Sequence, residues 1–183
     1  ERRLTKTRTA MEAAGIEVLC VTDPSNMAWL TGYDGWSFYV HQGVVVFLDA
    51  EPFWWGRSQD RNGALRTVWM EDSRCYGYAD HYVQSTERHP MQDLAAQLRA
   101  MGVATARIGV EMENYYYSAK AHAVLRHELP DAYFHDATAL VNWCRTVKSA
   151  EELAFIESCI PRGIDLPIVI HCRRAVEDLL PIL

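Results

Sequence analysis

Short runs of Val, Ile and aromatic residues alternate along this chain with segments whose apolar residues recur at helical spacing. This alternation restricts the possible folds more than any other feature of the sequence. The segment "GVVVFLDAEPFWWG", residues 43–56, holds two strand-like runs around Asp-Ala-Glu-Pro and therefore predicts a β-hairpin. Further strands are expected at residues 16–22, 75–79, 106–112 and 132–138, with 67–70 as another candidate. Helices are expected at residues 4–16, 25–33, 91–102 and 117–129. Residues 139–147 are expected to be either helical or extended.

The expected fold class is α/β, a three-layer α/β/α domain with a mixed β-sheet. Helices that alternate with strands cover both faces of a sheet. The hairpin excludes a purely parallel sheet, because parallel neighbours need a crossover connection. We expect the strand cores to include six aliphatic residues: Val18, Leu19, Val45, Val46, Ile108 and Val110.

The length of 183 residues fits one domain, or one domain followed by part of a second. We expect the domain to cover residues 1–148 and to be followed by a helix and an atypical tail over 149–183. Ser149 and Glu152 have the spacing of a capping box, which marks the start of that helix. The tail contains Pro161, Gly163 and Pro167, which a helix interior does not tolerate.

Composition excludes several classes of function. The net charge of −6 disfavours nucleic-acid binding, and there is no apolar run long enough to span a membrane. The N-terminal residues lack the apolar centre of a signal peptide. The five cysteines are odd in number and show no CxxC spacing, which disfavours a disulfide framework or a thiolate zinc site and favours a reducing, cytoplasmic location.

No self-contained catalytic or nucleotide-binding motif is present: GxGxxG, the Walker loop, HExxH and GxSxG are all missing. His81 and His89 lie near acidic residues, where a metal site can be imagined, but a polar surface loop with a turn before Pro90 explains them better. Glu111 and Glu113 alternate at a strand end, where they form either a carboxylate pair or a solvated turn. No metal or cofactor is therefore expected in this chain.

Two segments carry a resemblance to a known family. "TDPSNMAWLTGY", residues 22–33, resembles the N-x-x-Y/W-L-T-G segment that follows the first strand in the creatinase and Xaa-Pro peptidase family. "RTVKSAEELAFIE", residues 145–157, resembles the hinge between the two domains of that family. Within the family, "GYDGWSFYVHQ", "GRSQDRNGA" and "DHYVQSTERHP" are most similar to ectoine hydrolases.

The resemblance implies that this chain is the small, non-catalytic N-terminal domain of a hydrolase. In the family, the catalytic residues, and the metal pair of the peptidases, lie in a C-terminal domain for which these 183 residues have no room. We therefore expect the chain alone to be inactive, and any divalent metal to belong to that other domain. The resemblance also implies a homodimer in which the N-terminal domain covers the active site of the partner subunit.

Between the first strand and the hairpin, aromatic residues occur together with Gly32 and Gly35. Ectoine and creatine are small zwitterions with a delocalised cation, which an aromatic face attracts by about 0.5–2 kcal/mol. An arginine fork matches their carboxylate. The alternative is that these rings only pack between domains or subunits. The candidate substrate-capping residues are Trp36, Phe38, Tyr39, His41, Arg57 and Arg61.

Three functions remain open from the sequence. The first is the N-terminal domain of a creatinase-like C–N hydrolase that acts on ectoine or a similar zwitterion. The second is the same domain in an Xaa-Pro dipeptidase or aminopeptidase. The third is a stand-alone module for ligand binding or dimerisation. The chemistry of a following domain would distinguish them.

Overall fold

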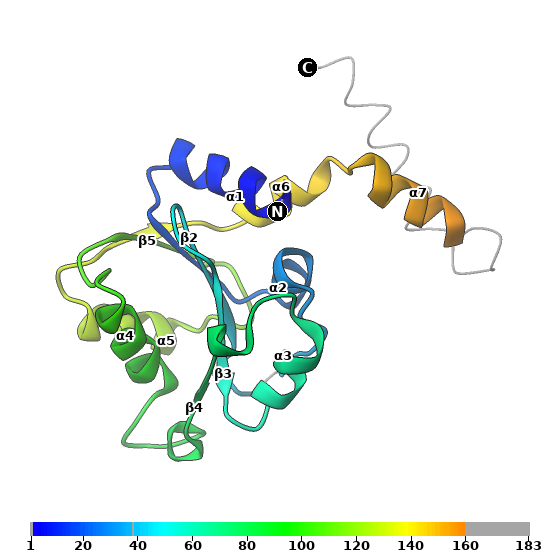
Figure 1. Ribbon diagram of the computed structural model, residues 1–183. Coiled ribbons are helices and arrows are strands. Elements are labelled where there is room, and N and C mark those ends of the chain that lie inside the picture. Colours follow the sequence, from blue (N-terminus) through cyan, green and yellow to red (C-terminus); the bar gives the residue numbers. More distant parts are fainter. Residues whose placement is uncertain (1, 38, 160–183) are drawn as a thin grey trace. The chain divides into compact units, whose positions relative to one another are not determined.

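Six strands form one mixed sheet in the order β4-β3-β2-β1-β5-β6 (Figure 1). The computed structural model describes residues 2–37 and 39–159. The strands are β1 (Val18–Val21), β2 (Gly43–Phe47), β3 (Phe53–Arg57), β4 (Cys75–Tyr78), β5 (Arg107–Val110) and β6 (Tyr133–Asp136). Strand β2 is antiparallel to both of its neighbours, β1 and β3, whereas all other adjacent pairs are parallel. The predicted hairpin and the predicted mixed sheet are confirmed.

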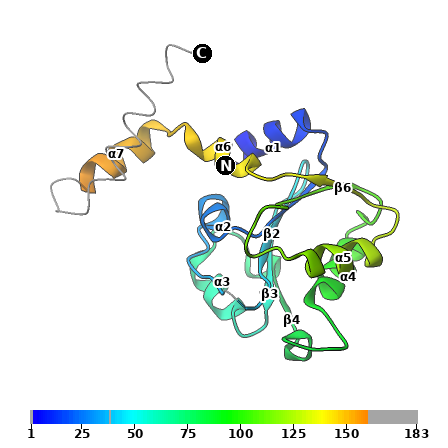
Figure 2. The ribbon, with the colours of Figure 1, turned by 180° about the vertical axis from the view of Figure 1, so that it is seen from behind.

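Helices cover both faces of this sheet. Helices α4 (Pro90–Ala100) and α5 (Ala119–Glu128) lie on one face, and α1 (Arg2–Ala13), α2 (Pro24–Thr31), α3 (Arg61–Thr67) and α6 (Leu140–Thr146) lie on the other (Figures 1 and 2). Two short 3₁₀ turns, η1 (Asp72–Arg74) and η2 (Asp80–Tyr82), flank β4. The three-layer α/β/α architecture expected from the sequence is therefore correct. No described helix is long and apolar enough to cross a membrane.

The core consists of two apolar clusters, one on each face of the sheet. Successive side chains of a strand point to opposite faces, so Val18 packs toward α4 and α5 while Leu19 packs toward α1 and α2. Trp54 and Trp55 divide between the faces in the same way, and both are fully buried. All six aliphatic residues predicted for the strand cores are buried.

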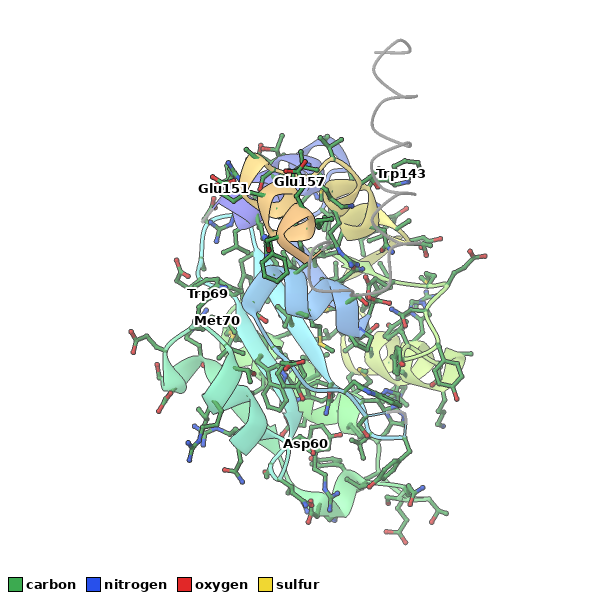
Figure 3. All side chains as sticks on the ribbon, turned by 90° about the vertical axis from the view of Figure 1, so that its right-hand side faces the viewer. Asp60, Trp69, Met70, Trp143, Glu151 and Glu157 are labelled. Carbon is green, nitrogen blue, oxygen red and sulfur yellow. The ribbon has the colours of Figure 1, made fainter. Side chains whose placement is uncertain are left out.

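Residues 57–70 differ from the expectation. Helix α3 lies in a segment for which the sequence predicted no element, and residues 67–70 form no strand. The N–H of Trp69 donates to the carbonyl of Thr31 (3.1 Å), and its indole Nε1 donates to the carbonyl of Leu30 (2.9 Å). This segment therefore binds the end of α2 instead of a sheet. In Figure 3, Asp60 lies near the start of α3, and Trp69 and Met70 lie past its other end.

The chain divides into one compact unit that spans Glu1–Cys144 and a second that spans Arg145–Leu183. In the second unit, α7 (Ala150–Cys159) begins with the predicted capping box: the Ser149 N–H donates to the Glu152 carboxylate (2.9 Å), and the Glu152 N–H donates to Ser149 Oγ (3.2 Å). The expected domain boundary at residue 148 stays a prediction. Residues 160–183 of the expected atypical tail lie outside the described residues.

Candidate functional site

The candidate site is the edge of the sheet at which the parallel strands end, here called the carboxyl edge. It consists of the segments that follow Val21, Arg57, Tyr78, Val110 and Asp136, together with the segment that precedes Gly43. Open α/β sheets bind ligands at this edge, because loops from several strands converge there. The candidate residues that the structure describes lie on segments that begin or end at this edge.

Residues 32–42, here called the aromatic loop, leave α2 through a left-handed turn. The backbone of Gly32 has φ +82° and its N–H donates to the carbonyl of Ala28 (2.8 Å), which ends the helix. A side chain there would be strained in conformation and would also meet the carbonyl oxygen of Thr67 at 2.9 Å. Gly35 is needed for another reason, since a Cβ at this position would lie 2.8 Å from the hydroxyl of Tyr33.

A buried hydrogen bond joins the two ends of the aromatic loop, and a second, partly buried one links the loop to Asp60. The hydroxyl of Tyr33 donates to Gln42 Oε1 (3.1 Å), and Gln42 Nε2 donates to Asp60 Oδ2 (3.0 Å). Burial is the main cause that raises the pKa of Tyr33 to about 12, so its hydroxyl keeps its proton at neutral pH. The loop therefore has a fixed base next to the start of α3.

The tip of the aromatic loop presents its rings outward. Trp36 is 59% exposed and Tyr39 is 51% exposed, whereas Val40 between the loop tip and β2 is buried. Phe38 lies outside the described residues. The indole of Trp36 stands edge-to-face against the ring of Tyr116, with centroids 6.2 Å apart. Tyr116 belongs to the segment after β5, which holds none of the residues predicted for the site. The rings of Trp36, Tyr39 and Tyr116 are here called the aromatic surface.

His41 is half-buried and packs against His89, with ring centroids 4.9 Å apart. Burial lowers the pKa of His41, and a hydrogen bond with the backbone of Tyr116 partly offsets this effect. Burial, His41 and Lys120 together lower the pKa of His89 to about 4. Both imidazoles are therefore neutral at physiological pH, and they form a wall of the site without adding positive charge.

A small cleft of about 130 Å³ lies beside this pair. Its lining includes Tyr39, His41, Tyr82, Arg88 and His89. Aromatic and imidazole rings make up much of this wall, a lining that suits a flat or delocalised group. The cleft is too small to enclose a drug-sized molecule, so it forms one side of a site and not a whole one.

Arg57 ends β3 at the same edge. Its Nε donates to Asp80 Oδ1 at 2.8 Å, and this ion pair lowers the pKa of the Asp80 carboxyl. Tyr39 and Asp60 are close enough to contribute to the electrostatic field at the guanidinium. Arg57 is therefore held at this edge through its Nε, the atom that donates to Asp80.

The structure separates Arg61 from the other candidates. Its Nε donates to the carbonyl of Cys75 (2.6 Å) and its Nη2 donates to the carbonyl of Asp72 (3.2 Å). Cys75 begins β4, so the guanidinium lies toward the opposite end of that strand from the carboxyl edge. These bonds give Arg61 a structural task, because they satisfy backbone carbonyls beside the outermost strand of the sheet.

Glu111 follows β5 at this edge, and its surroundings differ from both expectations for it. Its carboxylate is buried, with 4% of the residue exposed, whereas Glu113 is exposed. The two do not form a carboxylate pair, and Glu111 is not in a solvated turn. It accepts hydrogen bonds from the N–H groups of Thr22 (2.6 Å) and Asp23 (2.8 Å) instead. The one signal in the sequence is that Glu111 directly follows a buried strand.

The remaining histidines form no metal site within residues 2–37 and 39–159, where no group of three potential ligands is found. His81 stacks on Tyr82, and His122 accepts or donates a hydrogen bond at the hydroxyl of Tyr117 (3.0 Å). His89 Nδ1 accepts the N–H of Met91 (3.2 Å) and caps α4. The three cysteines of the described part that are free, Cys20, Cys75 and Cys144, are buried.

Comparison with known proteins identifies the family of this domain. A family model described as the creatinase/prolidase N-terminal domain matches residues 3–147. The ectoine hydrolase of Halomonas elongata is 56% identical over 155 residues, which cover 84% of this chain and 39% of that protein. An uncharacterized hydrolase/peptidase, y4tM of Sinorhizobium fredii, is 43% identical over 99% of this chain and 45% of its own length. The chain thus spans less than half the length of these relatives.

Solved structures share the fold. A proline dipeptidase from Streptococcus pneumoniae superposes with a TM-score of 0.64 at 22% identity, over 79% of this chain and 98% of that one. An Xaa-Pro dipeptidase from Bacillus anthracis gives 0.65 at 14% identity, over 86% of this chain and 39% of that one. At these identities the likeness concerns the fold of the domain alone.

Proposed function

Because this chain belongs to the creatinase/prolidase N-terminal domain family, we propose that it is the non-catalytic domain of a C–N hydrolase that acts on ectoine or a similar small zwitterion. The observation that carries this proposal is the 56% identity to an ectoine hydrolase over 84% of the chain. The family resemblance expected from the sequence is confirmed by the same comparisons.

The carboxyl edge supports a role in substrate capping. Trp36 and Tyr39 offer exposed aromatic faces, which attract a delocalised cation by about 0.5–2 kcal/mol. Arg57 ends β3 at the same edge of the sheet and carries a planar fork that can bind a carboxylate bidentately. A zwitterion with both groups therefore finds complementary partners on one surface. His41 packs against His89 and forms one wall of the cleft beside this surface.

The surface by itself binds one side of a ligand, since its cleft is open and small. We propose that the other side is the active site of a catalytic domain, contributed by the partner subunit of a homodimer. Any divalent metal would belong to that catalytic domain. In this arrangement the chain excludes water and orients substrate, and it moves no proton itself.

A second candidate is the N-terminal domain of an Xaa-Pro dipeptidase, as in the Bacillus anthracis protein that shares the fold. The identity of 14% to that protein gives it less support than the ectoine hydrolase has. A stand-alone binding module is the third candidate, and the exposed rings Trp36 and Tyr39 are compatible with it.

The test is a substrate comparison on the gene product that carries this chain. Purified protein is incubated with ectoine and, separately, with an alanyl-proline dipeptide, and product formation is followed by chromatography. Ectoine ring opening without dipeptide cleavage supports the proposal. Dipeptide cleavage without ectoine turnover supports the second candidate. Tight binding of ectoine with no turnover of either substrate supports the third.

A further inference from the structure

We propose that Glu111 is a positioning residue, whose buried carboxylate holds the two loops of the aromatic surface in one fixed arrangement. One loop is the aromatic loop, which carries Trp36. The other, residues 112–117, carries Tyr116 and is here called the tyrosine loop. Only the expected effect on substrate binding rests on the proposed function; the structural coupling does not.

The first set of contacts fixes the helix from which the aromatic loop starts. Glu111 Oε2 accepts the N–H groups of Thr22 and Asp23, and Oε1 accepts Asn26 Nδ2 at 2.7 Å. These residues precede and begin α2, where Asp23 is the N-cap. Helix α2 ends at Gly32, the first residue of the aromatic loop. The carboxylate therefore anchors one end of the segment that carries Trp36.

The second set of contacts fixes the tyrosine loop. Asn114 Nδ2 donates to Glu111 Oε2 at 3.0 Å, and Asn114 Oδ1 accepts the N–H of Tyr116 at 2.9 Å. The ring of Tyr116 then meets the indole of Trp36 edge-to-face. The contacts thus run from Glu111 through Asn114 and Tyr116 back to the aromatic loop, so that one carboxylate supports both sides of the ring pair.

The chemistry of this position requires a carboxylate. In the described part of the chain, the groups that bond to Glu111 are all donors, including the hydroxyl of Thr22 at 3.3 Å, and an ionised carboxylate is acceptor-only. An amide would turn an NH₂ group toward one of these donors. Burial of a charge is costly unless it is satisfied by such bonds. The position of this satisfied carboxylate at the junction of two loops fits a role in fixing them.

The chain offers a matched control two residues away. Glu113 has the same side chain, lies in the tyrosine loop and is exposed. Glu113→Gln changes the charge of the surface by the same amount as Glu111→Gln without touching the buried bonds. Asn114→Ala is a milder variant, since it removes the link to the tyrosine loop and leaves the bonds to α2 intact.

The first experiment is amide hydrogen exchange on this chain. We expect Glu111→Gln to speed exchange in residues 32–42 and in residues 112–117 together, by about fivefold or more, while Glu113→Gln leaves both unchanged. We expect Asn114→Ala to speed exchange in the tyrosine loop and at the tip of the aromatic loop. Faster exchange only at residues 22–26, or equal effects of both glutamate variants, would overturn the proposal. If Glu111→Gln fails to fold, Asn114→Ala decides the outcome.

The second experiment measures KM and kcat for ectoine on the protein that includes the catalytic domain. A loosened surface should raise KM about three- to tenfold at nearly unchanged kcat in Glu111→Gln, because binding contacts are weakened and the reacting groups are not. Coupled exchange together with an unchanged KM would keep the positioning role and refute the capping function. Absent coupling would refute the positioning role whatever KM shows.

Discussion

Protonation of His89 should make the unfolding free energy depend on pH. In the folded chain, burial and the neighbouring His41 and Lys120 lower the pKa of His89 from 6.5 to about 4. The neutral ring also accepts the N–H of Met91 and caps α4, a bond that an imidazolium cannot accept through the same nitrogen. As pH falls from 6.5 toward 4, the unfolded chain binds a proton at this residue and the folded chain does not. The stability that is present above pH 6.5 is therefore lost across this range.

The magnitude follows from the width of that window. Each pH unit over which only the unfolded chain is protonated lowers the unfolding free energy by about 1.4 kcal/mol. Between pH 6.5 and about pH 5 the upper bound is ~2 kcal/mol. Because the ring is only half-buried, solvent screens part of the penalty. We expect a loss of about 1 kcal/mol from this residue.

The assay is urea unfolding at about pH 7 and about pH 5, followed by circular dichroism, for the wild type and His89→Asn. Asparagine retains an N-cap acceptor but does not titrate. The variant should lose about 1 kcal/mol less than the wild type between the two pH values. His127→Asn, at a side chain that is 87% exposed, supplies the control and should match the wild type. An identical pH dependence in wild type and His89→Asn would refute the reasoning.

Three further predictions concern the candidate residues and the activity of this chain. Trp36→Ala should lower the unfolding free energy by only about 1 kcal/mol, and Tm by about 2–4 °C, because the indole is 59% exposed. In the full-length protein the same variant should raise the KM for ectoine about 2- to 30-fold. A large loss of Tm with an unchanged KM would show that the ring only packs. Arg61→Ala should lower the unfolding free energy by about 1–3 kcal/mol, because two carbonyls lose their donor, and should leave KM unchanged. Arg57→Ala should instead raise KM and leave the unfolding free energy nearly unchanged. Equal effects of both variants on KM would contradict the separation of the two arginines. This chain alone should hydrolyse neither ectoine nor alanyl-proline, and metal-dependent turnover above a blank would contradict the assignment as a non-catalytic domain.

The fold could be predicted from local patterns because those patterns agree with the tertiary structure. The hairpin of residues 43–56 has an apolar run on each side of a short turn, and both strands formed where expected. Residues 67–70 show the limit of such reasoning. Their apolar side chains suit a strand, but the N–H of Trp69 bonds to the carbonyl of Thr31. A contact with a residue far away in the sequence decided that segment, and a local pattern does not contain it.

The candidate site could be predicted only in part, because local patterns show some of its residues and distant contacts decide the others. The exposed rings of Trp36 and Tyr39 follow from glycine-rich turns in an aromatic segment, which the sequence displays. The role of Glu111 depends on donors up to 89 residues away, and Arg61 is held by carbonyls whose position depends on the path of β4. The sequence therefore indicated which segment forms the surface, but not which charged residues support it.

The most direct test of the capping function is a mixed-dimer experiment on the full-length protein. One subunit carries Trp36→Ala and Arg57→Ala with an intact catalytic domain, and the other has the native N-terminal domain and an inactivated catalytic domain. The mixed dimer is purified with two different tags, and its KM for ectoine is measured. If this domain covers the active site of its partner, the KM returns to the wild-type value at about half the kcat. A mixed dimer whose KM stays as high as that of the doubly substituted homodimer would contradict the account.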